Sequence, residues 1–115
     1  MITVAQLLRK LGITKIYKGY EQAIYCISLA VEDDFRLTAI TKEIYMVTAT
    51  KFGCKWTAIE RNMRTIVKHA WTTNKSFLCN IAGYPINHEP TVSEFIEIIA
   101  YRIRSEMQNN NHKIV

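Results

Sequence analysis

The stretch from Ala49 to Trp71 constrains the fold of this chain most strongly, because its spacing is that of a helix-turn-helix unit. Gly53 follows Ala49 by four residues and precedes Ile59 by six. A small residue at a helix crossing, a flexible turn residue and an apolar residue beneath the second helix are typical of this unit. The sequence therefore predicts a supporting helix that ends at Gly53 and a second helix that follows it.

The second helix is expected to bury one apolar stripe and to expose a polar face. The stripe recurs at helical spacing and comprises Ile59, Met63, Ile66 and Ala70. The opposite side carries Thr57, Arg61, Arg64 and Lys68. Such a face can contact phosphates, and the arginine fork matches the O6 and N7 acceptors of guanine in the major groove. The alternative is an ordinary solvated face, but the preceding turn favours a nucleic-acid surface.

The positive charge of the chain is concentrated around this unit. The whole chain carries +5, and residues 41–72 carry +4 of it, with two acids, Glu43 and Glu60, against six cations. The cations are Lys42, Lys51, Lys55, Arg61, Arg64 and Lys68. This distribution is typical of a surface that binds nucleic acid, and binding should weaken strongly with salt.

Length and composition indicate one compact domain. The chain has 115 residues, of which 49% are hydrophobic and 22% charged. No apolar run approaches the roughly 20 residues of a membrane span, and no signal peptide is recognisable, so we expect a soluble, cytoplasmic protein with no membrane association. Cys26, Cys54 and Cys79 are odd in number and lack a nearby Cys or His pair, which predicts reduced packing residues rather than disulfides or a metal site. No metal or other cofactor is expected.

Helix signals account for almost the whole chain, and no segment alternates as a strand. Capping boxes are expected at Thr3 to Gln6, Thr57 to Glu60 and Thr91 to Glu94. The acidic residues 32–34 are expected in a solvated loop. The inner side of the third helix is expected to comprise Ile40, Ile44, Val47 and Phe52. The predicted helices span residues 4–11, 20–31, 41–52, 57–72, 75–82 and 92–108, and the helix should fray from Asn109 onward.

Several blocks of sequence together resemble one family. They are G-I-T-K-I-Y-K-G-Y near the start, A-I-T-K-E-I-Y before the turn, K-F-G-C-K-W-T-A-I-E-R-N-M-R through it, and P-T-V-S-E-F-I near the end. The chain resembles the C-terminal effector domain of the sporulation master response regulator from about Ile2 to Glu106. The resemblance implies an all-α, compact six-helix domain over residues 1–108, with a polar tail at 109–115. It also implies sequence-specific double-stranded DNA binding and transcription regulation in sporulation, at boxes resembling TGTCGAA.

The resemblance also implies roles for individual residues of the reading helix. The family pattern R-x-E-R faces base edges, and Glu60 and Arg61 match it, whereas Ala58 occupies the place of its first arginine. One guanine contact, worth about 1 to 3 kcal/mol of discrimination, is therefore missing. Glu60 has two open interpretations, a helix cap for Thr57 or an acceptor for a cytosine amino group. The expected backbone contacts are Lys42, Lys55, Thr57, Arg64 and Lys68.

Regulation and partners follow only from the same resemblance. The family's regulator has an N-terminal receiver domain with a phosphorylated aspartate, and the sequence here contains no matching pocket, so we expect an excised effector fragment or a free-standing relative. The segment around Asn74, Lys75 and Phe77 resembles the family's contact with the RNA polymerase sigma factor. A homodimer on tandem boxes is a further expectation.

Other functional classes have weaker support. No nucleophile with a nearby base, metal-binding histidine pair or glycine-rich phosphate loop is present, so we do not expect an enzyme. His69 is expected to be a packing residue or a satisfied polar group, and Trp56 and Trp71 to pack in the core or at a hinge. The alternative function is a protein-binding adaptor that kept this fold but lost specific DNA recognition, which the loss of arginine at Ala58 motivates.

Overall fold

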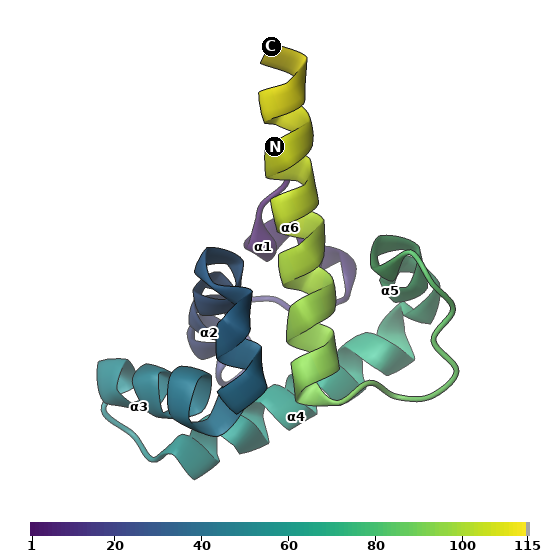
Figure 1. The fold of residues 1–115 in the computed structure, drawn as a ribbon. Helices are drawn as coiled ribbons and strands as arrows, with labels where there is room; N and C mark the ends of the chain where they lie inside the picture. The colour runs from purple at the N-terminus through teal and green to yellow at the C-terminus, as the bar shows by residue number, and fades with distance from the viewer. Residues whose placement is uncertain (115) are drawn as a thin grey trace.

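The chain folds into a bundle of helices, as the helix signals predict. The computed structural model describes the backbone of residues 1–114 and the side chains of residues 1–109, and no strand occurs in that part. Two shorter helical segments, a 3₁₀ helix η1 and a π-helical η2, lie between α2 and α3 (Figure 1). The elements are α1 (Val4–Lys10), α2 (Tyr20–Glu32), η1 (Asp34–Ala39), η2 (Thr41–Tyr45), α3 (Met46–Phe52), α4 (Trp56–Thr73), α5 (Lys75–Ala82) and α6 (Val92–Ile114).

Two of the three predicted capping boxes form. At the start of α1, the Thr3 backbone N–H donates to Gln6 Oε1 at 2.8 Å, and the Gln6 N–H donates to Thr3 Oγ1 at 3.1 Å. The same reciprocal pair joins Thr91 and Glu94 at the start of α6, at 2.8 and 3.1 Å. Each box satisfies two N–H groups that a helix start leaves without a partner, which explains why both helices begin where the sequence predicts.

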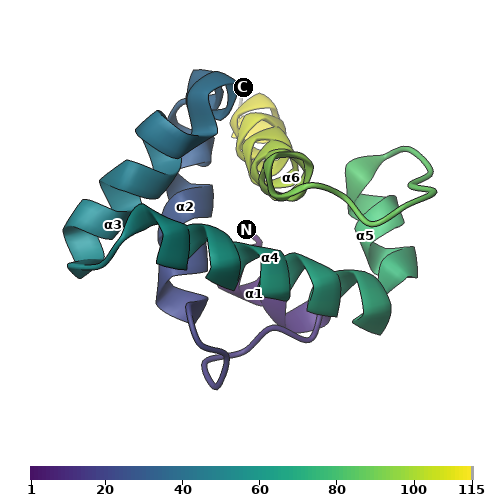
Figure 2. The same cartoon turned by 90° about the horizontal axis from the view of Figure 1, so that it is seen from below.

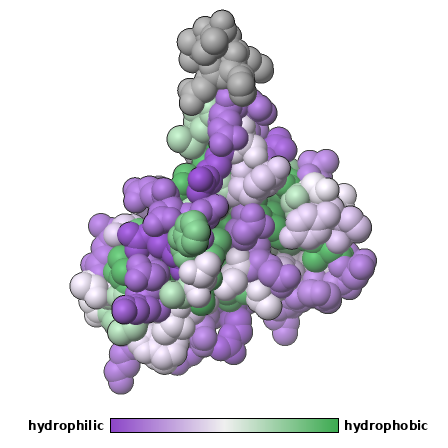
Figure 3. Space-filling model, in the orientation of Figure 1, coloured by the Kyte–Doolittle hydropathy of each residue, from purple (hydrophilic) through white to green (hydrophobic). Residues whose placement is uncertain are grey.

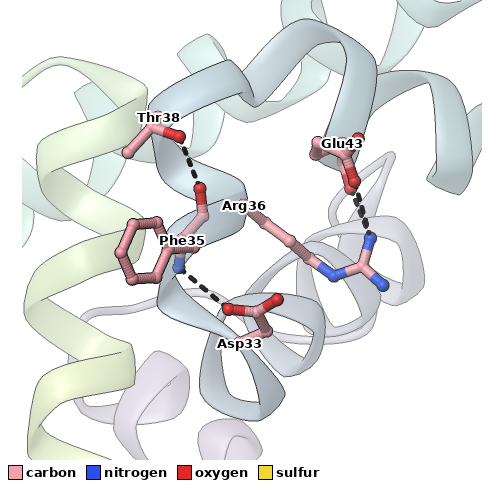
Figure 4. Close-up of polar contacts among 5 residues, drawn as sticks. All are labelled: Asp33, Phe35, Arg36, Thr38 and Glu43. Atoms are coloured by element: carbon pink, nitrogen blue, oxygen red, sulfur yellow. Dashed lines mark hydrogen bonds and ion pairs between the residues drawn. The ribbon is translucent and has the colours of Figure 1, made fainter.

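The acidic residues 32–34 are exposed, as expected, but they form no separate loop, because α2 ends at Glu32 and η1 begins at Asp34. Asp33 Oδ1 accepts the Phe35 N–H at 3.1 Å and starts the 3₁₀ helix η1 (Figure 4). From η1, Arg36 Nη1 donates to the Glu43 carbonyl at 2.8 Å and lies 3.6 Å from Glu43 Oε2, so that its guanidinium reaches η2. Local side-chain bonding to the backbone gives this segment helical turns that hydrophobic periodicity does not reveal.

The third predicted helix is divided into η2 and α3, and its expected inner side is partly wrong. Ile44 is buried and Ile40 packs against the core, as expected, but Val47 is only half-buried and Phe52 is exposed. The other buried residues are Tyr45, Thr48 and Ala49. A π-helical turn has a different angular step between successive side chains, so a pattern of 3.6 residues does not carry across it.

The core forms where α6 crosses the other helices. Figure 1 shows α6 running up the middle of the molecule, and it contacts α1, α2, α4, α5 and η1. Phe95, Ile99 and Ile103 on α6 are buried, as predicted. At the N-terminus, the Ile2 N–H donates to Glu106 Oε2 at 3.3 Å. Burial of each large apolar side chain contributes about 1.5 to 3 kcal/mol, so α6 stabilises the whole bundle.

At its C-terminal end, the backbone of α6 is helical to Ile114, beyond Asn109, where the sequence predicts fraying. The side chains of residues 110–115 lie outside the described residues, and the division between domain and tail at 108 stays a prediction. Among the described residues, no helix has the length and apolar character needed to cross a membrane.

Candidate functional site

The predicted helix-turn-helix forms from α3, the turn 53–55 and α4. Gly53 adopts the left-handed conformation with φ of 67° that ends α3, and its N–H bonds to the Ala49 carbonyl. The Cys54 N–H donates to the same carbonyl at 3.1 Å. Ala49 and Ile59 are both buried. The small residue, the turn residue and the apolar residue beneath α4 therefore have the predicted positions.

The start of α4 differs from the prediction. The helix begins at Trp56 with Lys55 as its N-cap, and no side chain bonds to the free N–H groups of the first turn. The predicted capping box between Thr57 and Glu60 does not form, because Thr57 already lies within the helix. Uncapped N–H groups at a helix N-terminus are donors available to an external acceptor.

The two faces of α4 are as the periodicity predicts. The apolar stripe of Ile59, Met63, Ile66 and Ala70 is completely buried. The opposite face is exposed along its length, at Thr57, Arg61, Arg64 and Lys68. Seen from below, α4 crosses the molecule with its full length toward the viewer (Figure 2), and hydrophilic side chains project from the lower edge of the surface (Figure 3). The cationic face is thus open to a large partner.

Glu60 and Arg64 form the one ion pair on this face among the side chains that the structure describes. Glu60 Oε1 accepts from Arg64 Nη2, one helical turn away, and the cap interpretation of Glu60 is therefore wrong. An exposed pair of this kind contributes about 0.3 to 0.5 kcal/mol, so either side chain can exchange it for another partner at little cost. Its interpretation as a cytosine acceptor stays a prediction.

The other residues predicted to contact DNA lie at the start of α4 and on η2. Lys55 is exposed at the N-terminus of α4, and Lys42 is exposed on η2. Ala58 is half-buried in the first turn of α4 and offers only a methyl group. The structure therefore brings the expected backbone contacts to exposed positions on the helix-turn-helix and its flank, without placing any of them on a ligand.

Trp56 is the exception to the expected use of the tryptophans. It is 36% exposed at the surface of α4, and its ring stacks on Tyr45 with centroids 6.5 Å apart and an angle of 4° between the planes. Burial raises the pKa of Tyr45 to about 12, with the Glu60 carboxylate adding to the shift. Trp71 is half-buried, with the Lys75 ammonium 4.7 Å from its ring. Trp71 packs against the core, as expected, whereas Trp56 packs on Tyr45 and stays partly exposed.

The flank of α4 that faces the N-terminal part of the chain is fixed by polar contacts. Asn62 Nδ2 donates to Gln22 Oε1 at 2.9 Å, and the Tyr17 hydroxyl lies 2.6 Å from His69 Nε2. His69 is therefore a hydrogen-bonded polar group, which confirms one of the two interpretations that the sequence left open. Gly19 lies against Asn62, and an added Cβ there would come within 2.6 Å of Asn62 Cβ. These contacts set the position of α4 from segments 40 to 52 residues away in the chain.

The cysteines differ from one another in their surroundings. All three are free thiols, and Cys26 is buried with its Sγ 3.4 Å from Thr48 Oγ1. Burial raises the pKa of Cys26 to about 11. Cys54 is exposed in the turn before α4, so the expectation of a packing role is wrong for this residue. Among the described residues, no group of three or more His, Cys, Asp or Glu side chains is placed to hold a metal ion.

The residues expected to meet the sigma factor are used partly within the fold. Asn74 Oδ1 accepts the Phe77 N–H at 3.2 Å and caps α5, while Asn74 Nδ2 donates to the Lys10 carbonyl at 3.0 Å. Phe77 is half-buried, with the Lys10 ammonium 5.3 Å from its ring. Of the three, Lys75 is the most open. The sigma contact stays a prediction.

A known family model matches most of this chain. The family model described as "Sporulation initiation factor Spo0A C terminal" matches residues 4–103, from the first residue of α1 to the buried Ile103 of α6. The matched range contains the whole helix-turn-helix.

Proposed function

The chain belongs to the family of Spo0A C-terminal domains, DNA-binding regulatory domains of sporulation, and on this premise we propose that α4 reads a specific promoter sequence in the major groove. The observation that supports this most directly is the exposed cationic face of α4 behind the Gly53 turn. In a helix-turn-helix, the second helix enters the major groove and its N-terminal residues meet the base edges. A regulator of this kind acts at the chromosome, in the cytoplasm.

Within this arrangement we assign different roles to the side chains of α4. Arg61 donates to a guanine, and Glu60 accepts from a cytosine after it releases Arg64. Backbone positioning falls to Arg64, Lys68, Thr57, Lys55 and Lys42, all of which are exposed. The uncapped first turn of α4 adds N–H donors for a phosphate oxygen.

Transcription control requires contacts beyond the DNA. We propose that two copies bind tandem boxes as a homodimer, and that the region around Lys75 approaches the sigma factor of RNA polymerase. Lys75 is exposed, so a partner can reach its ammonium group beside the Trp71 ring. Asn74 and Phe77 would act through the position of α5, because their polar and aromatic groups already have partners in the fold.

The second candidate is a protein-binding adaptor with this fold. The observation in its favour is Ala58, a half-buried methyl group in the first turn of α4. An adaptor would not distinguish one duplex from another. The two functions therefore differ in a measurable way.

The test is an anisotropy titration of the protein with a duplex containing a TGTCGAA box and with a scrambled duplex, at two salt concentrations. Arg61→Ala should weaken binding to the preferred duplex and relax its preference by about 1 to 3 kcal/mol. Lys68→Ala is the matched control on the same exposed face, and it should weaken both duplexes similarly and reduce the salt slope. Equal binding of the wild-type protein to specific and scrambled duplexes, with no effect of either variant, would favour the adaptor.

A further inference from the structure

A large aromatic side chain is exposed at the N-terminal end of α4. Trp56 is the first residue of α4 and keeps 36% of its surface exposed. Its ring stacks on Tyr45, which is itself almost completely buried, so the indole rests on a rigid support. A supported aromatic side chain loses little conformational entropy when a partner covers its remaining surface.

The surroundings of Trp56 form an apolar hollow between α3 and the first turn of α4. The lining residues are Met46, Ala49, Thr50, Cys54, Lys55, Trp56 and Thr57. Met46 is 47% exposed, and Lys55 brings a positive charge to the hollow. The hollow is continuous with the cationic face through Thr57, so a duplex held on that face would lie against it.

The chemistry of the first turn restricts which part of a duplex it can recognise. Residues 56–58 are Trp, Thr and Ala, and none provides the forked donor that pairs with guanine. Stacking on a base is disfavoured, because duplex bases are already stacked and Tyr45 covers one face of the indole. The apolar group at the base edges of the major groove is the 5-methyl group of thymine.

We propose that Trp56 is a specificity-determining residue that contacts a thymine methyl group in the target duplex. This inference rests on the proposed function, because it requires α4 to lie in the major groove. Trp56 then selects thymine through the edge of its indole, while Tyr45 holds the ring in place. Thr57, the next residue of α4, lines the same hollow.

The experiment uses a duplex enriched from a random library by the wild-type protein. Each thymine is then replaced in turn by deoxyuridine, which removes the methyl group and keeps the base-pairing edge. We expect at least one replacement to weaken binding about fourfold, the factor that corresponds to exposing one buried methyl-sized group. Trp56→Ala should bind the thymine and uracil duplexes equally at that position, and Trp71→Phe, a change at the other end of α4, should keep the wild-type difference.

A second measurement leaves Trp56 intact. In the Trp71→Phe variant, Trp56 is the sole tryptophan, and its emission should shift on the enriched duplex and shift less on the uracil duplex. The inference is overturned if no deoxyuridine replacement weakens binding of the wild-type protein. It is also overturned if the wild-type protein and Trp56→Ala lose the same affinity at each replaced thymine. In both cases the proposed sequence-specific DNA binding still stands. If no sequence is enriched over the starting library, the proposed function fails and this inference fails with it.

Discussion

Asn74→Ala tests how α5 is joined to the rest of the domain. The substitution removes the cap on the Phe77 N–H and the hydrogen bond to the Lys10 carbonyl. Loss of an N-cap costs about 1 kcal/mol, and loss of one further hydrogen bond at an exposed site costs about 0.5 to 1 kcal/mol. We therefore expect the free energy of unfolding to fall by about 1.5 to 2 kcal/mol. Urea denaturation followed by helical circular dichroism measures it, with the slope unchanged.

Two matched variants separate the contributions. Asn74→Asp keeps an acceptor for the Phe77 N–H and places a negative charge at the start of α5, but it cannot donate to Lys10. It should lose less stability than Asn74→Ala. Asn80→Ala changes an exposed asparagine on the same helix and should alter stability by less than about 0.5 kcal/mol. Equal unfolding midpoints for Asn74→Ala and Asn80→Ala would refute the assignment of both hydrogen bonds.

This result also bears on transcription. Under the proposed function, a loss of transcription regulation in Asn74→Ala would have one of two causes, a displaced α5 or a lost sigma contact. If Asn74→Asp recovers stability and regulation together, the residue acts by positioning α5. A stable Asn74→Asp that still fails to regulate transcription indicates a direct contact.

Three other predictions concern local chemistry. At pH 8, iodoacetamide should modify the exposed Cys54 long before Cys26, because burial raises the pKa of the Cys26 thiol to about 11. Mass spectrometry of the digested protein identifies the order, and modification of Cys26 first would contradict its burial. The pKa of Glu94 is lowered, first of all by the Thr91 N–H, so this carboxylate adds stability above the ordinary glutamate pKa and loses it as the pH falls through the lowered value. Glu94→Gln should flatten that part of the stability curve in acid denaturation, and an unchanged curve argues against the effect. Gly53→Ala should cost about 1 to 2 kcal/mol in urea denaturation from the left-handed backbone alone, since a Cβ there meets no atom within 4 Å; a much larger loss would mean that the turn is more crowded than the structure shows.

Local signals predicted most of the fold. The capping boxes at Thr3 and Thr91 and the turn glycine Gly53 mark helix ends within a few residues of sequence, and all three occur as predicted. The 3₁₀ and π-helical segments were not predictable in the same way. They depend on local side-chain bonds, such as the link from Arg36 to Glu43 across η1 and η2, which hydrophobic periodicity does not reveal (Figure 4).

In the candidate site, the buried and exposed faces of α4 were predictable from the sequence, and the N-terminal end of α4 was less so. The period of 3.6 residues places Ile59 inside and Arg61 outside wherever α4 begins. For Trp56, the expectation of packing in the core or at a hinge comes from the usual burial of aromatic side chains in small helical domains. At a helix end, however, fewer neighbours cover a side chain, and Trp56 meets Tyr45 on one face while the rest stays exposed. Likewise, Glu60 matches a capping pattern but bonds to Arg64, because α4 begins before Thr57.

The bonds from α4 to Tyr17 and Gln22 limit how this unit can be used outside its own chain. Transplanting residues 41–73 onto another scaffold would carry the cationic face but leave behind the partners of Asn62 and His69. The graft would then hold its arginines at an angle set by the new host. Engineering a new DNA preference should therefore begin with substitutions inside the complete domain, since the helix-turn-helix of this protein is not a portable module.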